Sequence, residues 1–196
     1  MASTEFSVGN VLQAARQSLD FARQGAEDYR AGESRRVSGL FNFATSSRTV
    51  TFVLQNMKGH VAGFEDWYSP IQAKMRADPV ARWAIDLRNR VEKRGDPGPR
   101  SNVTHIDYLD TSVLTAGVPP GTVSTIIGDQ WGRNFWIVRL PDGTEENVFF
   151  NLDPSIGKNF IVFEDAPGGR DVPELMNEHL STLETLIMSA EAHFGV

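Results

Sequence analysis

The sequence predicts an α+β protein: a mainly helical bundle with a small antiparallel β-sheet inserted before the C-terminal helix. Apolar residues recur at helical spacing in the first half of the chain and again at its end, whereas the stretch between them alternates like strands. Asp96-Pro97-Gly98 marks the first change. We therefore expect residues 1–96 and 170–196 to form the bundle and residues 97–169 to form an inserted β-rich subdomain. Because strands and helices are segregated along the chain, a parallel βαβ fold is disfavoured.

Composition indicates an ordinary globular protein with one domain and an insertion. Of its 196 residues, 40% are hydrophobic and 22% are charged. The absence of cysteine excludes disulfides, thiolate catalysis and cysteine zinc sites, and it agrees with a cytoplasmic location. No apolar run is long enough to span a membrane, and the N-terminus lacks signal-peptide features, so no membrane partner is expected. The net charge of -6 disfavours broad binding to nucleic acid, although a local basic patch can serve a short RNA.

The first two helices are expected over residues 5–30 and 33–58. Apolar residues trace one face of the first helix, and polar residues cover the remainder. The second helix carries an apolar stripe that consists of Val37, Leu40, Phe41, Ala44, Thr51, Leu54 and Met57. Gly39 weakens this helix locally and permits a close approach of another helix.

Arg48 lies on the apolar stripe of the second helix. A half-buried arginine needs an acidic partner or a ligand, because its charge is costly to remove from water. Two interpretations remain open here: a structural ion pair, or an anion contact that faces the helix of Arg88.

The third and fourth helices are expected over residues 63–76 and 78–94. The third contains Trp67 and Tyr68, whose aromatic rings form either core or a binding platform.

Asp78 is a good N-cap for the fourth helix, and Gly95 ends it. Trp83 and Leu87 belong to its apolar stripe, which should be buried against the second helix.

The stretch 103–164 is expected to form an antiparallel sheet of three to five strands, with a hairpin at Pro141-Asp142-Gly143. Helical spacing returns over residues 171–194. Asp171 and Glu174 resemble a capping box at the start of this helix. Its apolar side requires the earlier helices as cover, so the sheet is predicted to interrupt one bundle.

The sequence contains no motif that indicates a metal or cofactor site. The histidines are scattered without metal-ligand spacing, the glycines form no phosphate loop, and no nucleophile motif is present. We therefore expect neither a metal nor a cofactor.

The polar side of the fourth helix gathers the candidate functional residues. Arg82, Asn89 and Lys93 share one column with Asp86, and Arg88 lies beside them. Arg88 and Lys93 are close enough for long side chains to reach one anion. Further candidates for ligand contact are Arg48, Trp67, Tyr68 and Arg82.

The run Arg88-Asn89-Arg90-Val91-Glu92-Lys93 resembles the motif of the HEPN (higher eukaryotes and prokaryotes nucleotide-binding) superfamily. That family is helical, and its active members are metal-independent ribonucleases with an Arg, a polar residue and a nearby His. The resemblance implies catalytic roles for Arg88, Asn89 and Lys93, RNA or a nucleotide as partner, and a homodimer. It also implies a bacterial stress or defence setting. Whether the chain is an enzyme stays open; if it is, a metal-independent endoribonuclease is expected.

Lys93 occupies the position of the family's histidine. Histidine titrates near neutrality and serves as a base for the 2′-hydroxyl, whereas an ordinary lysine is protonated and binds phosphate instead. We therefore expect RNA binding more readily than RNA cleavage. The pair Arg100 and His105 has the family's spacing, but it enters an expected strand.

Two non-enzymatic alternatives remain. In a protein-interaction module, Arg88 belongs to a salt-bridge network and the sheet binds a protein. Its carboxylate partners would be Asp86, Glu65 or Glu92. In a small-molecule-binding module, a pocket lies between bundle and sheet. Its aromatic lining would be Trp67, Tyr68, Trp83 and Trp136.

Overall fold

The computed structural model describes residues 6–32, 34–98, 100–106, 117–151 and 157–195. The helices are α1 (Val8–Ala31), α2 (Arg35–Gln55), α3 (Phe64–Ala77), α4 (Pro79–Arg94), the short η1 (Pro167–Gly169) and α6 (Val172–Phe194). The strands are β1 (Arg100–Ile106), β2 (Thr122–Ile126), β3 (Asn134–Arg139), β4 (Glu145–Phe150) and β5 (Gly157–Phe163). The α+β class and the order of elements are therefore as predicted.

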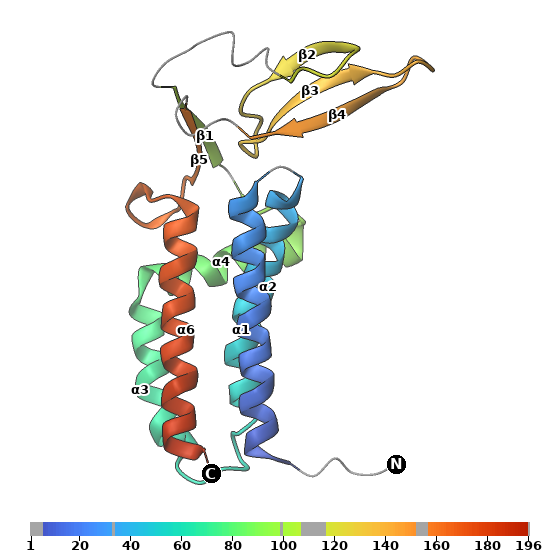
Figure 1. Ribbon diagram of the computed structural model, residues 1–196. Coiled ribbons are helices and arrows are strands. Elements are labelled where there is room, and N and C mark those ends of the chain that lie inside the picture. Colours follow the sequence, from blue (N-terminus) through green and yellow to red (C-terminus); the bar gives the residue numbers. More distant parts are fainter. Residues whose placement is uncertain (1–5, 33, 99, 107–116, 152–156, 196) are drawn as a thin grey trace.

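The long helices run along one bundle, and the strands lie beyond one of its ends (Figure 1). The last helix, α6, returns alongside α1 after the strands. Two ion pairs join these helices: Arg16 to Glu191 at 2.5 Å and Arg23 to Glu184 at 2.7 Å. The insertion of the strands before a helix of the same bundle is thus confirmed. α4 crosses the bundle near the end that carries the strands (Figure 1).

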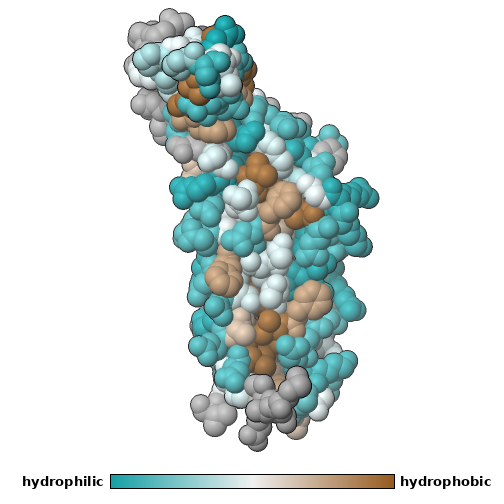
Figure 2. Space-filling view, turned by 90° about the vertical axis from the view of Figure 1, so that its right-hand side faces the viewer, coloured by the Kyte–Doolittle hydropathy of each residue, from teal (hydrophilic) through white to brown (hydrophobic). Residues whose placement is uncertain are grey.

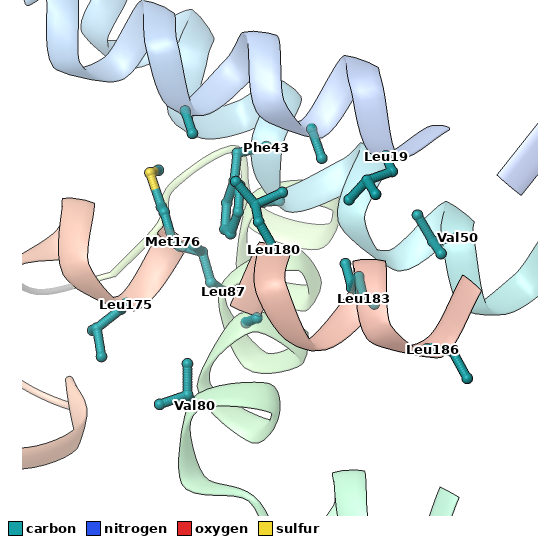
Figure 3. Close-up of a cluster of buried hydrophobic side chains, with 14 of the residues drawn as sticks. Leu19, Phe43, Val50, Val80, Leu87, Leu175, Met176, Leu180, Leu183 and Leu186 are labelled. Carbon is teal, nitrogen blue, oxygen red and sulfur yellow. The ribbon is translucent and has the colours of Figure 1, made fainter. Parts of the chain in front are cut away.

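The core lies where α1, α2, α4 and α6 face one another (Figure 3). Leu19, Phe43, Leu87 and Leu183 come from these four helices in turn, and each is fully buried. The predicted stripe of α2 is only partly correct. Phe43 is buried and was not in it, whereas Phe41, which was, is half-buried. Because α2 is weakly amphipathic, the hydrophobic period of its sequence predicts an apolar face that is rotated from the face that is buried.

The ends of α4 follow the sequence signals. The Asp78 side chain accepts a hydrogen bond from the backbone N–H of Val80 at 2.8 Å, and Gly95 ends the helix in the left-handed conformation. Trp83 is buried, and its ring is tilted against that of Phe163 in β5 with centroids 6.2 Å apart. This contact was not predicted, because it links segments far apart in the chain.

The capping box predicted at the start of α6 does not form. Asp171 occupies the N-cap position, but its side chain makes no capping hydrogen bond. Glu174 instead lies 3.5 Å from Arg170, outside the helix. The helix begins without a capping box, and Pro173 in its first turn has no N–H that would need an acceptor.

The strands form two separate antiparallel sheets in the described residues, where one sheet was expected. β1 pairs with β5 from Arg100 opposite Phe163 to Ile106 opposite Gly157, and β2, β3 and β4 form the second sheet. The predicted hairpin joins β3 to β4. There, the Asp142 carboxylate accepts bonds from the N–H and hydroxyl of Thr144. The domain boundaries near residues 97 and 169 stay predictions.

None of the described helices combines the length and the apolar character that crossing a bilayer requires.

Candidate functional site

Two arginines from different helices meet at one exposed aromatic ring. The guanidinium carbon of Arg48, on α2, lies 4.0 Å from the centroid of the Phe52 ring. That of Arg88, on α4, lies 6.0 Å from the same centroid. Phe52 is 46% exposed, so the ring and both cations border solvent. We call Arg48, Phe52 and Arg88 the two-arginine site.

Arg48 is held without a carboxylate partner in the part of the chain that the structure describes. Its Nη1 donates to the Thr51 hydroxyl at 2.7 Å, and Thr51 is itself anchored to the Arg48 carbonyl. Burial and the neighbouring charge of Arg88 lower the pKa of Arg48, and Tyr68 opposes this change. The repulsion between two cations favours an anion at this position.

Arg88 is only partly neutralised. Its Nη2 lies 2.6 Å from the Glu92 carboxylate one turn later, and its Nη1 donates to Asn89 Oδ1 at 3.2 Å. The Arg88 Nε is buried and has no hydrogen-bond partner in the described structure. Of the three carboxylates proposed for Arg88, Glu92 forms the pair. The site therefore holds two cations against one carboxylate.

The helix that carries Arg48 is unusually poor in charge. Between Arg36 and Lys58, Arg48 is the only charged residue, although positions such as Thr45 and Phe52 are exposed. The space-filling view from the α1 and α2 side shows a column of pale and brown side chains between teal borders (Figure 2). Because no other charged side chain lies near Arg48 along α2, none competes with it for a bound anion.

The structure brings together some of the predicted site residues. Arg48, Arg88 and Asn89 converge, and Tyr68 is near enough to influence the charge of Arg48. Tyr68 is buried, and burial raises the pKa of its phenol. It therefore supports the site from beneath and offers little surface to a ligand.

Other predicted residues lie apart from the two-arginine site. Trp67 donates from Nε1 to the Ser189 hydroxyl at 3.2 Å and packs edge-on against Phe194. Arg82 and Lys93 are exposed, and neither forms an ion pair with any described residue. Lys93 is in the last turn of α4, where positive charge is favourable to the helix.

The aromatic pocket predicted between bundle and sheet is wrong for the described residues. Trp83 faces Phe163, whereas Trp136 stacks on Phe150 with centroids 4.1 Å apart in the three-stranded sheet. Trp136 lies outside the main core cluster. Sequence could not show this, because the partners Phe163 and Phe150 are set by tertiary packing and by strand pairing.

His179, on α6, is a core histidine. It is 4% exposed, and its ring meets that of Phe43 edge-on at 6.1 Å. Burial lowers its pKa from 6.5 to about 4, opposed by the charge of Asp78. The imidazole is therefore neutral at pH 7.

The neutral state of His179 predicts acid sensitivity. The unfolded chain binds a proton near pH 6.5 and the folded chain only near pH 4, so stability is complete above pH 6.5 and falls between these values. The difference corresponds to a loss on the order of 3 kcal/mol. Urea unfolding across pH 4–7 should show this loss in wild type and not in His179→Leu. As the control, His193→Gln, which removes an exposed imidazole, should behave like wild type.

No group of three or more His, Asp or Glu side chains is placed to hold a metal ion within the described ranges. The pair Arg100 and His105 falls on β1, as expected for a strand.

Phe52 is the residue of the site that sequence reasoning missed. A signal existed: Arg48 and Phe52 are four residues apart, so they share one face of a helix. The contribution of Arg88 to the same ring depends on how α2 and α4 pack, which local patterns do not determine.

Comparison with known proteins points to one phage family. A family model described as "Bacteriophage lambda protein ea47" matches residues 20–111. Over 58 residues the chain is 40% identical to Protein ea47 of Escherichia phage lambda, a stretch that is 29% of this chain and 14% of the relative. The matched portion is thus a small part of that longer protein. No solved structure matches the chain. The family match includes Arg48, Phe52 and Arg88; it runs from within α1 through α2, α3, α4 and β1, and it does not reach α6.

Proposed function

We propose that the protein binds short single-stranded RNA, without cleaving it, through the two-arginine site. The observation that carries this proposal is the meeting of Arg48 and Arg88 at the exposed ring of Phe52 with a single carboxylate, Glu92, beside them. Guanidinium groups bind phosphate oxygens in bidentate fashion. An exposed aromatic ring offers a stacking surface to a base, independent of base identity.

In this proposal each residue of the site has a separate role. Arg48 and Arg88 hold one phosphate between them, and its charge relieves their mutual repulsion. The unpartnered Nε of Arg88 supplies a further donor close to this position. Asn89 accepts a bond from Arg88 and thereby orients its guanidinium. The exposed part of Phe52 contacts the neighbouring base.

The proposal is limited to binding because a general base is missing from this cluster of described residues. Cleavage at the 2′-hydroxyl requires a group that accepts a proton near neutral pH. Glu92 is engaged by Arg88, and Lys93 is exposed in the last turn of α4. A degenerate HEPN-like protein would have this character.

Substitutions at the site should show how much each residue contributes to RNA affinity, as measured by an anisotropy titration with labelled oligouridine. Arg48→Gln and Arg88→Gln should each weaken binding and reduce the slope of log K against log salt by about 0.7. Phe52→Ala should weaken binding about tenfold through lost stacking, and Phe52→Trp should restore it. Circular dichroism checks that each variant is folded.

Arg82→Gln is the matched control, because it removes the same charge from α4 at an exposed position away from Phe52. It should bind RNA like wild type. If wild type binds no RNA at about 50 mM salt, or if Arg82→Gln weakens binding as much as Arg88→Gln, the proposal is wrong.

A cytoplasmic location, a homodimer and a role in bacterial stress or defence belong to the same proposal. RNA is available in the cytoplasm, and a homodimer would place two of these sites in one particle. Sedimentation equilibrium distinguishes a dimer from the 21.7 kDa monomer.

A further inference from the structure

A groove separates α3 from α6. Its volume is about 440 Å³. Ile71, Met75 and Leu186 provide apolar walls, and serine and threonine side chains of α6 provide hydroxyl groups. Lys74 and Asp78 lie at its edge with opposite charges. A volume of this size and a mostly apolar lining are typical of small-molecule sites.

A second, much smaller cavity lies inside the bundle. It measures about 10 Å³ and is lined by polar side chains of α2 and by His179 of α6. The α2 residues are Ser47, Arg48 and Thr51. Such a volume accommodates a single oxygen-sized group. Met75 lines both this cavity and the groove, so one flexible side chain is common to their walls.

His179 gives the small cavity an unused hydrogen-bonding atom. Its Nδ1 is buried and has no partner among the residues described, although the side chain is only 4% exposed. Met75 lines both the groove and the cavity that His179 borders, which places the groove and His179 close together; the charge of Asp78, another residue of the groove, opposes the lowering of the His179 pKa. Burial of an unsatisfied polar atom is unfavourable, so a ligand that bonds to it gains affinity.

We propose that the α3–α6 groove binds a small uncharged molecule with an apolar body and one hydroxyl group, and that this hydroxyl bonds to Nδ1 of His179. The apolar body lies against Ile71 and Leu186 once Met75 has turned aside. A hydroxyl both donates and accepts, so it satisfies either tautomer of the neutral ring. Lys74 and Asp78 bring opposite charges to the groove, so its lining favours neither a cation nor an anion; the guanidinium of Arg48, which lines the small cavity, donates to the Thr51 hydroxyl.

Phenol and toluene are suitable probes, because they share a ring and differ in the hydroxyl. In protein with ¹³C-labelled methionine methyl groups, phenol should shift the Met75 signal. Met188, which is 57% exposed on α6 and does not line the groove, is the internal control and should not shift. A Met75 signal that neither probe moves would overturn the proposal.

The contribution of His179 is measured by the ratio of phenol to toluene affinity. This ratio should be about tenfold higher in wild type than in His179→Leu, because only the imidazole bonds to the hydroxyl. His179→Gln retains a hydrogen-bonding side chain and should keep part of the preference. Equal ratios in wild type and both variants would contradict the assignment. Both affinities are measured without RNA, so this test is independent of RNA binding.

Discussion

Replacing Trp83 with alanine is expected to lower the free energy of unfolding by about 3–5 kcal/mol. Trp83 is 3% exposed on α4, and its ring faces Phe163 of β5. The change removes a large apolar side chain from the core and also its contact with β5. Urea unfolding followed by circular dichroism measures the loss.

Trp83→Phe is the matched control for this prediction. The Trp83 Nε1 is buried without a hydrogen-bond partner in the described structure, and phenylalanine lacks this atom. The gain from removing an unsatisfied donor offsets part of the lost volume, so Trp83→Phe should remain within about 1.5 kcal/mol of wild type. Equal losses in both variants would mean that the core does not depend on an aromatic ring at this position.

Gly39→Ala is expected to destabilise the protein by about 1–3 kcal/mol or more, although alanine is the better helix former. A methyl group at Gly39 would lie 2.5 Å from the backbone nitrogen of Tyr29 and 2.6 Å from the carbonyl oxygen of Gly25. Both atoms belong to the backbone of α1, so the clash is relieved only if the two helices separate. Thermal and urea unfolding should both register the change.

Gly9→Ala tests the same substitution without the clash. At Gly9, on α1, a methyl group would meet only the Ser7 hydroxyl oxygen at 3.7 Å, an ordinary contact. Stability should be unchanged or should rise by up to about 1 kcal/mol from helix propensity. If Gly39→Ala proves as stable as Gly9→Ala, α1 and α2 do not approach as closely as the structure shows.

Much of the helical architecture was predictable because its determinants are local. Asp78 and Gly95 define the ends of α4, and the spacing of Trp83 and Leu87 places both in the core. The Pro141–Gly143 hairpin is equally local, since turn and flanking strands are contiguous. Elements of this kind follow from capping, turn chemistry and hydrophobic period.

The division of the strands into two sheets was not predictable from these signals. The 50 residues 107–156 separate β1 from β5, so no turn specifies their register. The stripe of α2 was uncertain for a different reason. Serine, threonine and phenylalanine occur on all sides of this helix, so its hydrophobic period does not separate the buried Phe43 from the half-buried Phe41.

The candidate site was predictable in part. Arg48 and Arg88 were recognised individually, as a charge on an apolar stripe and as part of a short motif. Their convergence on Phe52 depends on the packing of α2 against α4, which lies outside sequence patterns. Lys93 was a candidate because of its place in the motif and Trp67 because of its aromatic ring, yet Lys93 lies on the exposed end of α4 and Trp67 packs on α6.

The most direct test of RNA binding at the two-arginine site follows the arginine side chains by NMR. In ¹⁵N-labelled protein titrated with oligouridine, the Nε–Hε signals of Arg48 and Arg88 should shift together and saturate at one dissociation constant. The signal of Arg82, exposed elsewhere on α4, should stay in place. Shifts at Arg82 with none at Arg48 and Arg88, or no shift at any arginine at low salt, would contradict the account.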